Sequence, residues 1–336
     1  MTRQSLIYFL KKLGKKPAFR VLMSICLLAL LMTKLSISDL WNTIRQIPIV
    51  LWLSILIAFI MGHFLGVLKW NLFINSGQKK LPFSTTFRCY FAGLFANLFL
   101  PSVAGGDVVR AGLAIRFNGE KEAVVVGSVL DRFLDISSLG LIILIGAFFS
   151  RTSFEERDRL ILFSLFILIM IVVVGTLLFV IIPIPNIFPK KIIEFIERLR
   201  GNIKRLLSNP KRAFLGFLLA MCIQGSFVVL NAVLGGACNI DLPLYIWFLA
   251  WPIAKLSAML PISLGGIGIR EMTLAAFLDR FGVPLSRSVG LGLLWETIIV
   301  AGGGIGGIFY FLAKKSAPNS NTFLPKTENV PGKVIN

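Results

Sequence analysis

The sequence is poor in the residue types that build metal and disulfide sites. Its 336 residues include one histidine, His63, and four cysteines that stand apart in apolar sequence without a CxxC pair. A zinc site or a disulfide framework is therefore not expected. The sequence also lacks a nucleotide-binding Gly-Lys-Ser/Thr loop, a nucleophile elbow and a metal-ligand cluster. We predict that the chain holds no cofactor and no metal, does not hydrolyse ATP by itself and is not an enzyme.

Charged residues are scarce as well, at 15%, whereas 56% of the residues are hydrophobic. This composition leaves too much apolar surface for a soluble domain of this length. A membrane helix needs about 20 apolar residues, and suitable runs occur near 18–33, 48–68, 123–149, 160–182, 213–235 and 286–312, with two more at 83–100 and 244–260. We therefore predict an all-α, polytopic membrane protein.

The formal net charge of +19 raises the possibility of nucleic acid as a partner. The basic residues cluster in the polar ends and loops, however, where topology and anionic lipid headgroups explain them better. We expect no nucleic-acid partner. The first apolar run follows six basic residues but no cleavage site follows it, which predicts an uncleaved first helix. We divide the chain into a basic cytosolic segment 1–18, a transmembrane domain 19–313 and a polar, disordered tail 314–336.

A short motif occurs twice with identical spacing. Its members are Pro101, Gly105, Gly106 and Arg110 in the first copy, and Pro261, Gly265, Gly266 and Arg270 in the second. Proline lacks an N–H and glycine tolerates unusual dihedrals, so each motif is expected to break a helix. The freed backbone groups must then face protein or water. We predict two hairpins, at 83–117 and 244–282, that are re-entrant or consist of broken helices, with Pro101 and Pro261 as helix breakers.

The distribution of Lys and Arg predicts the orientation of these hairpins. Six occur in 1–20, four in 69–88, eight in 183–213 and four in 313–336, whereas 236–243 has none. Because basic loops stay in the cytosol, both termini are predicted to be cytosolic. The two hairpins then point in opposite directions, which is the inverted repeat of many transporters. We expect an integral protein of the plasma membrane.

The helix that restarts after each Gly-Gly would offer free N–H groups, its positive dipole end and an arginine one turn further on. This arrangement suits phosphate. We identify the candidates for lipid phosphate binding as Gly105, Gly106, Arg110, Gly265, Gly266 and Arg270. The alternative is that proline and glycine only kink and pack the helices, while each arginine neutralises Asp107 or Glu271.

Other charged residues lie within the apolar runs. Asp131 and Asp135 are four residues apart, on one helical face beside Arg132. They are candidates to pair with Arg110 or Arg270 or to relay protons, and a fixed ion pair is the alternative. The same two interpretations apply to Lys255 and Glu296. The full set of candidates for charge balance or proton relay is Asp107, Asp131, Arg132, Asp135, Lys255, Glu271 and Glu296. His63 is given no role.

The stretches NLFLPSVAGGDVVRAG, VLDRFLD and LPISLGGIGIRE resemble the membrane region of lysylphosphatidylglycerol synthases and its stand-alone flippase-like relatives, over roughly residues 20–312. The resemblance implies a helical protein that helps to move a lipid between leaflets. The family motif falls on Asn97, Pro101, Gly105, Gly106, Asp107, Arg110, Asp131, Arg132 and Asp135, and in the second half on Pro261, Ser263, Gly265, Gly266, Gly268 and Glu271. The full synthases add a soluble lysyl-transferase domain, whereas a polar tail follows here, so lysyl transfer is not expected.

Together these observations predict a lipid flippase-like transporter for a phosphate-bearing lipid, either a phospholipid or a polyprenyl-phosphate-linked lipid. Its expected partners are membrane lipids, with separate lipid-modifying enzymes as further candidates, and the sequence does not indicate an oligomeric state. Some relatives carry glycolipid or polyprenyl-sugar synthase labels. A membrane subunit or enzyme of glycolipid or polyprenyl-sugar synthesis is therefore the alternative function.

Overall fold

The computed structural model describes residues 37–150 except 78, 101–104 and 119, then the single positions 167, 197, 200, 201 and 204, and residues 209–315 except 260–262 and 264. Pro101 and Pro261 therefore lie outside the described residues. So do the predicted first helix, nearly all of the apolar run 160–182, and the terminal segments 1–18 and 316–336.

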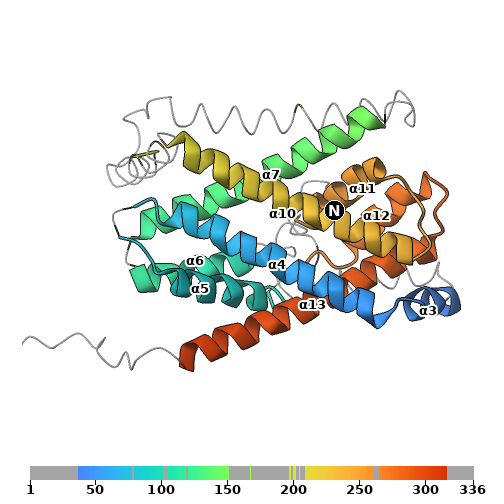
Figure 1. Cartoon of the computed structure of the whole chain (residues 1–336), viewed down its shortest axis with the longest axis horizontal. Helices are drawn as coiled ribbons and strands as arrows, with labels where there is room; N and C mark the ends of the chain where they lie inside the picture. Colours follow the sequence, from blue (N-terminus) through green and yellow to red (C-terminus); the bar gives the residue numbers. More distant parts are fainter. Residues whose placement is uncertain are drawn as a thin grey trace, which may run out of the picture.

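Four long helices form the body of the described structure: α4 (Ile49–Ile74), α7 (Lys121–Phe149), α10 (Pro210–Ala237) and α13 (Leu285–Lys315). Each is long and apolar enough to cross a membrane, because even the 26 residues of α4 extend over about 39 Å. They run along the long axis of the molecule and pack against one another (Figure 1). The predicted all-α membrane fold is confirmed for the described residues.

The ends of these helices follow from local sequence. Pro48 precedes α4 and has an extended backbone, as expected of a residue that cannot donate a hydrogen bond within the helix. Pro210 is the first residue of α10, and the side chain of Asn209 accepts a hydrogen bond from the backbone N–H of Arg212 at 3.1 Å. This is an N-cap of the usual type.

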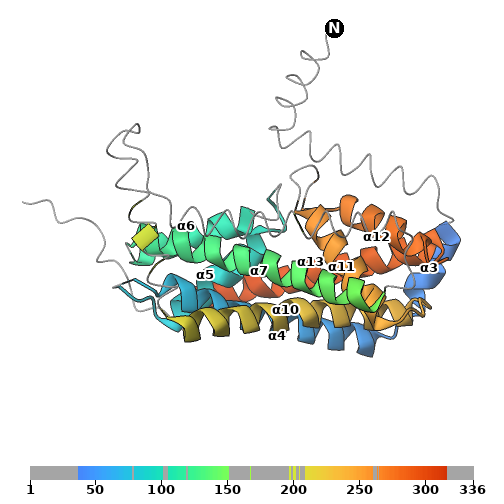
Figure 2. The ribbon, with the colours of Figure 1, turned by 90° about the horizontal axis from the view of Figure 1, so that it is seen from above.

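Five shorter helices complete the described part: α3 (Ile37–Arg45), α5 (Phe83–Ala96), α6 (Gly105–Asn118), α11 (Leu244–Ala258) and α12 (Ile269–Asp279). α5 packs against α6, and α11 packs against α12. The first pair lies at one end of the long helices and the second pair at the other end (Figure 1). In the view from above, α4 and α10 lie along one face, and α6 and α12 along the opposite one (Figure 2).

The two halves of the chain pack in corresponding ways. The first hairpin packs through α5 against α13, the long helix of the second half, while the second hairpin packs through α11 against α7 of the first half. α4 and α10, the helices that precede the two hairpins in sequence, pack against each other. Each hairpin thus stands between long helices from both halves. The opposite orientation of the hairpins relative to a membrane remains a prediction.

The two copies of the motif have different local structures. α6 begins at Gly105, so the Gly-Gly pair forms the first helical turn. In the second copy Gly265, Gly266 and Gly268 have φ of 58°, 86° and 86°, and α12 begins only at Ile269. The second helix therefore restarts after the Gly-Gly pair, as expected, whereas the first begins with the pair itself. The residue that corresponds to Gly268 in the first copy is Val108, a β-branched residue that does not tolerate positive φ.

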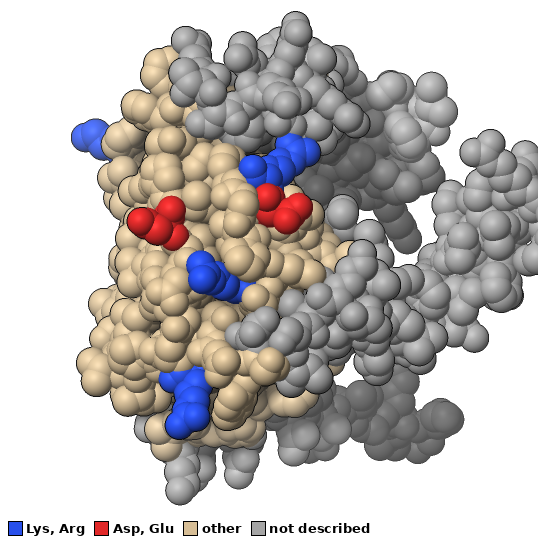
Figure 3. Space-filling model, turned by 90° about the vertical axis from the view of Figure 1, so that its right-hand side faces the viewer, with Lys and Arg blue, Asp and Glu red and all other residues tan. Residues whose placement is uncertain are grey.

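The outer surface of the molecule is largely apolar. Ile57, Met61, Val129 and Val300 on three of the long helices are all more than half exposed. Figure 3 shows one end of the molecule, where most of the described surface is free of charged side chains. Such a surface suits contact with lipid. Charged residues in the interior of such a protein are unusual, because an ionised group inside a membrane bundle is energetically costly.

Candidate functional site

A cavity of about 90 Å³ lies among the helices α4, α5, α6, α7, α10 and α11. Its charged lining residues are Lys69, Asp107, Arg110, Asp131, Arg132, Asp135 and Lys255, and its polar ones include His63, Tyr90, Asn97 and Gln224. Four helices thus bring charged side chains to one point inside an apolar bundle. Because ionised groups are costly within a membrane, such a cluster indicates a functional site.

The two aspartates of α7 share a lysine that the sequence analysis did not identify. Lys69 is only 2% exposed, and its Nζ lies 3.1 Å from Oδ1 of Asp131 and 2.5 Å from Oδ1 of Asp135. Hydropathy predicted that Lys69 belongs to the polar stretch 69–88, but the structure places it inside α4. The signal for this was the apolar sequence that continues after it, from Trp70 to Ile74.

Arg110 is held by two carboxylates and two aromatic rings. Its Nη2 lies 2.7 Å from Oδ2 of Asp131 and 3.0 Å from Oδ1 of Asp107. Its guanidinium also lies over the rings of Trp70 and Tyr90, 4.9 and 5.0 Å from their centroids, at distances typical of cation–π contacts. Of the two arginines considered for Asp131, the structure pairs it with Arg110.

Asp107 has a second cationic partner, because the Nε of Arg132 also donates to it. With 31% of its side chain accessible, Arg132 is far more exposed than Lys69 or Arg110. The two aspartates of the VLDRFLD stretch thus meet at Lys69, whereas Arg132 contacts the acid of the first motif. This cross-link joins α6 to α7.

The glycines of the first motif permit a close contact between α5 and α6. A Cβ on Gly106 would overlap the carbonyl oxygen of Gly93, which leaves no room for a side chain. The backbone N–H of Gly106 donates to Oδ1 of Asn97 at 2.7 Å. One of the N–H groups expected to bind phosphate is therefore already bonded within the protein.

Lys255 approaches the cavity from α11. Its Nζ donates to Oε1 of Gln224 at 2.6 Å and lies 4.8 Å from the centroid of the Phe227 ring. The amide nitrogen of Gln224 donates in turn to Oδ1 of Asp135 at 2.9 Å. The glutamine thus connects the lysine to the carboxylate without a direct ion pair.

The second motif forms a separate cluster. Nη2 of Arg270 lies 3.0 Å from Oε1 of Glu271 and also donates to Glu296 of α13. Oε2 of Glu271 accepts from the backbone N–H of Gly268 at 2.6 Å. These residues do not line the cavity described above. The structure therefore separates Lys255 from Glu296, and Arg110 from Arg270.

Both motif arginines are thus neutralised by carboxylates, including the acid of their own motif. This pairing is the one expected if each arginine stabilises the fold. His63, which was given no role, lines the cavity, and its Nδ1 lies 3.2 Å from the hydroxyl of Tyr90. Among the described residues, no group of three or more His, Cys, Asp or Glu side chains is placed to hold a metal ion.

The four candidate membrane spans within the described ranges, together with the charged cavity, define an integral membrane protein with a polar interior site. The chain belongs to the family described as the lysylphosphatidylglycerol synthase TM region, whose model matches residues 18–307. It is also similar to a UPF0104 membrane protein of Pyrococcus horikoshii, with 23% identity over 278 residues that cover 71% of this chain and 81% of that protein. No solved structure matches the chain significantly.

Proposed function

We propose that this protein is a lipid flippase-like transporter that moves a phosphate-bearing lipid between the two leaflets of the plasma membrane. The observation that carries the proposal is the charged cavity inside a bundle of membrane-spanning helices. A phosphate group that crosses hydrocarbon unaided must lose its water, at a cost of many kcal/mol. A polar cavity within the bundle would lower that barrier.

The charge of the cavity supports an anionic ligand. Its lining contains four cations, Lys69, Arg110, Arg132 and Lys255, and three carboxylates, so a net charge of +1 remains when all are ionised. An uncompensated cation inside an apolar bundle is unfavourable. A bound anion would compensate it.

The size of the cavity limits what enters it. Its volume of about 90 Å³ is small compared with the roughly 300–1,000 Å³ of most ligand pockets, so we expect it to take the phosphate group and not the acyl chains. The chains would remain outside, among the apolar helix surfaces. Opposed hairpins at the two ends of the bundle would allow the phosphate to be reached from either side in turn.

Because we expect no ATP hydrolysis, transport would be either downhill or coupled to an ion gradient. Both termini would lie in the cytosol, and membrane lipids would be the partners. We do not propose that the chain catalyses a reaction.

Reconstitution in liposomes tests this function. Wild-type protein is expected to accelerate the loss of outer-leaflet label from a fluorescent anionic phospholipid, with and without an imposed pH gradient. Arg110→Gln should slow that loss, because it removes a lining cation and leaves Asp131 with one partner fewer. Arg116→Gln, on the exposed side of the same helix, is the matched control.

Size-exclusion profiles of all three proteins must agree before rates are compared. Equal rates in protein-free and wild-type liposomes, across phospholipid and polyprenyl-phosphate lipids, would contradict transport. A change in lipid mass when a sugar donor is added would instead support the glycolipid-synthesis alternative.

A further inference from the structure

Lys255 differs from the other three cations of the cavity. Lys69, Arg110 and Arg132 each form an ion pair with at least one aspartate. Among the described residues no carboxylate is within ion-pair distance of Lys255, whose Nζ contacts the amide oxygen of Gln224 and the ring of Phe227. The excess positive charge of the cavity is therefore located at Lys255.

The neighbouring glutamine holds this lysine in place without neutralising it. An amide must present its oxygen to an ammonium group and its NH₂ to a carboxylate, and Gln224 does both, toward Lys255 and Asp135 respectively. Its orientation is therefore determined by its two neighbours. An ammonium group has three donors, so the contact with Gln224 leaves two N–H groups for a ligand.

We propose that Lys255, rather than the motif arginines, binds the phosphate, and that the site selects a phosphodiester with a single negative charge. This inference rests on the proposed function and narrows its substrate class. A net charge of +1 is balanced by one phosphodiester. A terminal phosphomonoester carries about −1.5 to −2 at neutral pH and would leave the cavity with excess negative charge beside Asp107, Asp131 and Asp135.

The other cations support this assignment. Arg110 already engages two carboxylates and two rings, and the buried Nζ of Lys69 lies between two aspartates. The charges of Arg110 and Lys69 are already balanced by carboxylates of the protein, so a phosphate bound at either would add negative charge next to these aspartates. Lys255 can bind phosphate while keeping its contact with Gln224.

The test measures the binding of short-chain lipids to the full-length protein in neutral detergent. Dihexanoyl phosphatidylglycerol has one negative charge, the matching phosphatidic acid is a phosphomonoester, and the matching phosphatidylcholine has no net charge. Wild type is expected to bind phosphatidylglycerol most tightly. Lys255→Gln, which can still donate to Gln224, should raise the dissociation constant at least tenfold, because a hydrogen bond to a charged group contributes about 1.5–3 kcal/mol.

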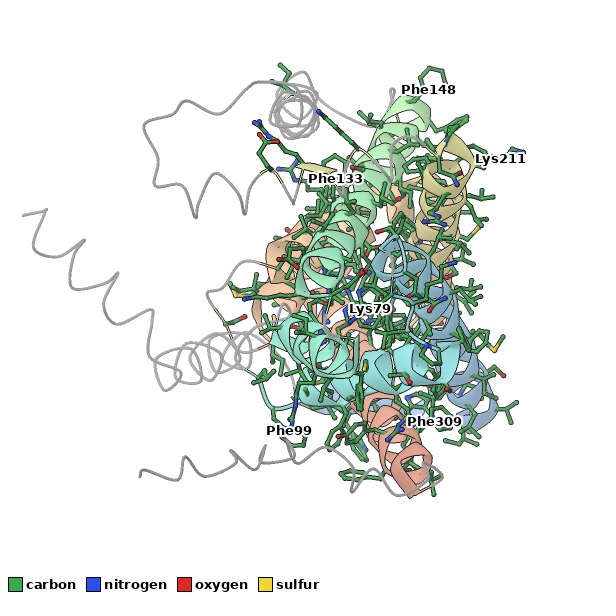
Figure 4. All side chains as sticks on the ribbon, turned by 90° about the vertical axis from the view of Figure 1, so that its left-hand side faces the viewer. Lys79, Phe99, Phe133, Phe148, Lys211 and Phe309 are labelled. Carbon is green, nitrogen blue, oxygen red and sulfur yellow. The ribbon has the colours of Figure 1, made fainter. Side chains whose placement is uncertain are left out.

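Two further variants serve as controls. Lys255→Arg keeps the charge and should retain most of the affinity. Lys211→Gln removes an exposed lysine that points away from the bundle (Figure 4) and should bind as wild type does. Glycerophosphoglycerol, the same headgroup without acyl chains, identifies the source of the ligand. Equal competition by it would indicate a free phosphodiester, and weak competition a lipid.

Equal affinity of wild type and folded Lys255→Gln for phosphatidylglycerol would overturn the inference, as would tighter binding of phosphatidic acid by wild type. If Lys255→Gln does not fold, the inference is tested instead by chemical modification of lysine amines in the wild-type protein. Phosphatidylglycerol should then slow the modification of Lys255 and not of Lys211, and equal effects on both would overturn the inference. If phosphatidylglycerol binding depends on Lys255 but no lipid moves in liposomes, only the proposed transport function is refuted. If Lys255→Gln moves lipid at the wild-type rate, only the assignment of Lys255 as the phosphate-binding residue is refuted.

Discussion

Replacing Lys69 with methionine removes the cation shared by Asp131 and Asp135 while keeping the length of the side chain. The Nζ of Lys69 lies 3.1 and 2.5 Å from the two carboxylate oxygens, and an effective dielectric constant near 20 makes each attraction about 5–7 kcal/mol. Desolvation of the buried charges offsets much of this. Removing one partner of a buried pair costs about 3–5 kcal/mol. Arg110 and Gln224 remain as partners of the aspartates, so we expect a loss near the lower value, about 3 kcal/mol.

The assay is equilibrium unfolding in detergent micelles, with Lys80→Met as the control because Lys80 is exposed. The double variant Lys69→Met/Asp135→Asn should recover part of the lost stability, since it removes the charge of one of the two carboxylates that lose their contact with Lys69. A surface substitution changes stability by about 0.5 kcal/mol or less. If Lys69→Met unfolds within that margin of Lys80→Met, the buried ion pair does not stabilise this fold and the reasoning is refuted.

Two other predictions concern topology and backbone. In a variant without native cysteines, Lys80→Cys should be protected from an impermeant thiol reagent in intact cells and Asp241→Cys should be labelled, because the Lys/Arg distribution places the first loop in the cytosol; the reverse pattern would overturn the predicted orientation. Gly266→Ala should destabilise the protein by about 1–3 kcal/mol, because Gly266 has φ of 86° and a Cβ there would lie 2.6 Å from Cβ of Ala258. Gly112 in α6 has open space around it. Gly112→Ala should therefore be neutral or stabilising by up to about 1 kcal/mol. Equal unfolding midpoints for these two alanine variants would contradict the second argument.

Several features of the described structure could be predicted because they depend on short stretches of chain. Hydropathy over about 20 residues indicates a membrane helix, and it located α7, α10 and α13 closely, whereas α4 continues past the predicted end at residue 68 to Ile74. The spacing of Asp131 and Asp135 predicted that both face one side of α7, and both contact Lys69. The Gly-Gly pairs predicted interruptions at the two hairpins. The later start of α12 also has a local cause, because the second motif has Gly268 where the first motif has the β-branched Val108.

The partners of the charged side chains were decided only by tertiary structure. Lys69 and Asp135 are 66 residues apart, and Gln224 and Asp135 are 89 apart. Hydropathy and helical period describe one segment at a time, and they contain no information on how far one helix is shifted or rotated against another. That packing places Lys255 in the cavity with Asp135 and Gln224, and Glu296 in a separate cluster with Arg270. The same residue types on helices packed one turn differently would have other partners, because a turn moves a side chain by about 5.4 Å and an ion pair requires contact within about 4 Å.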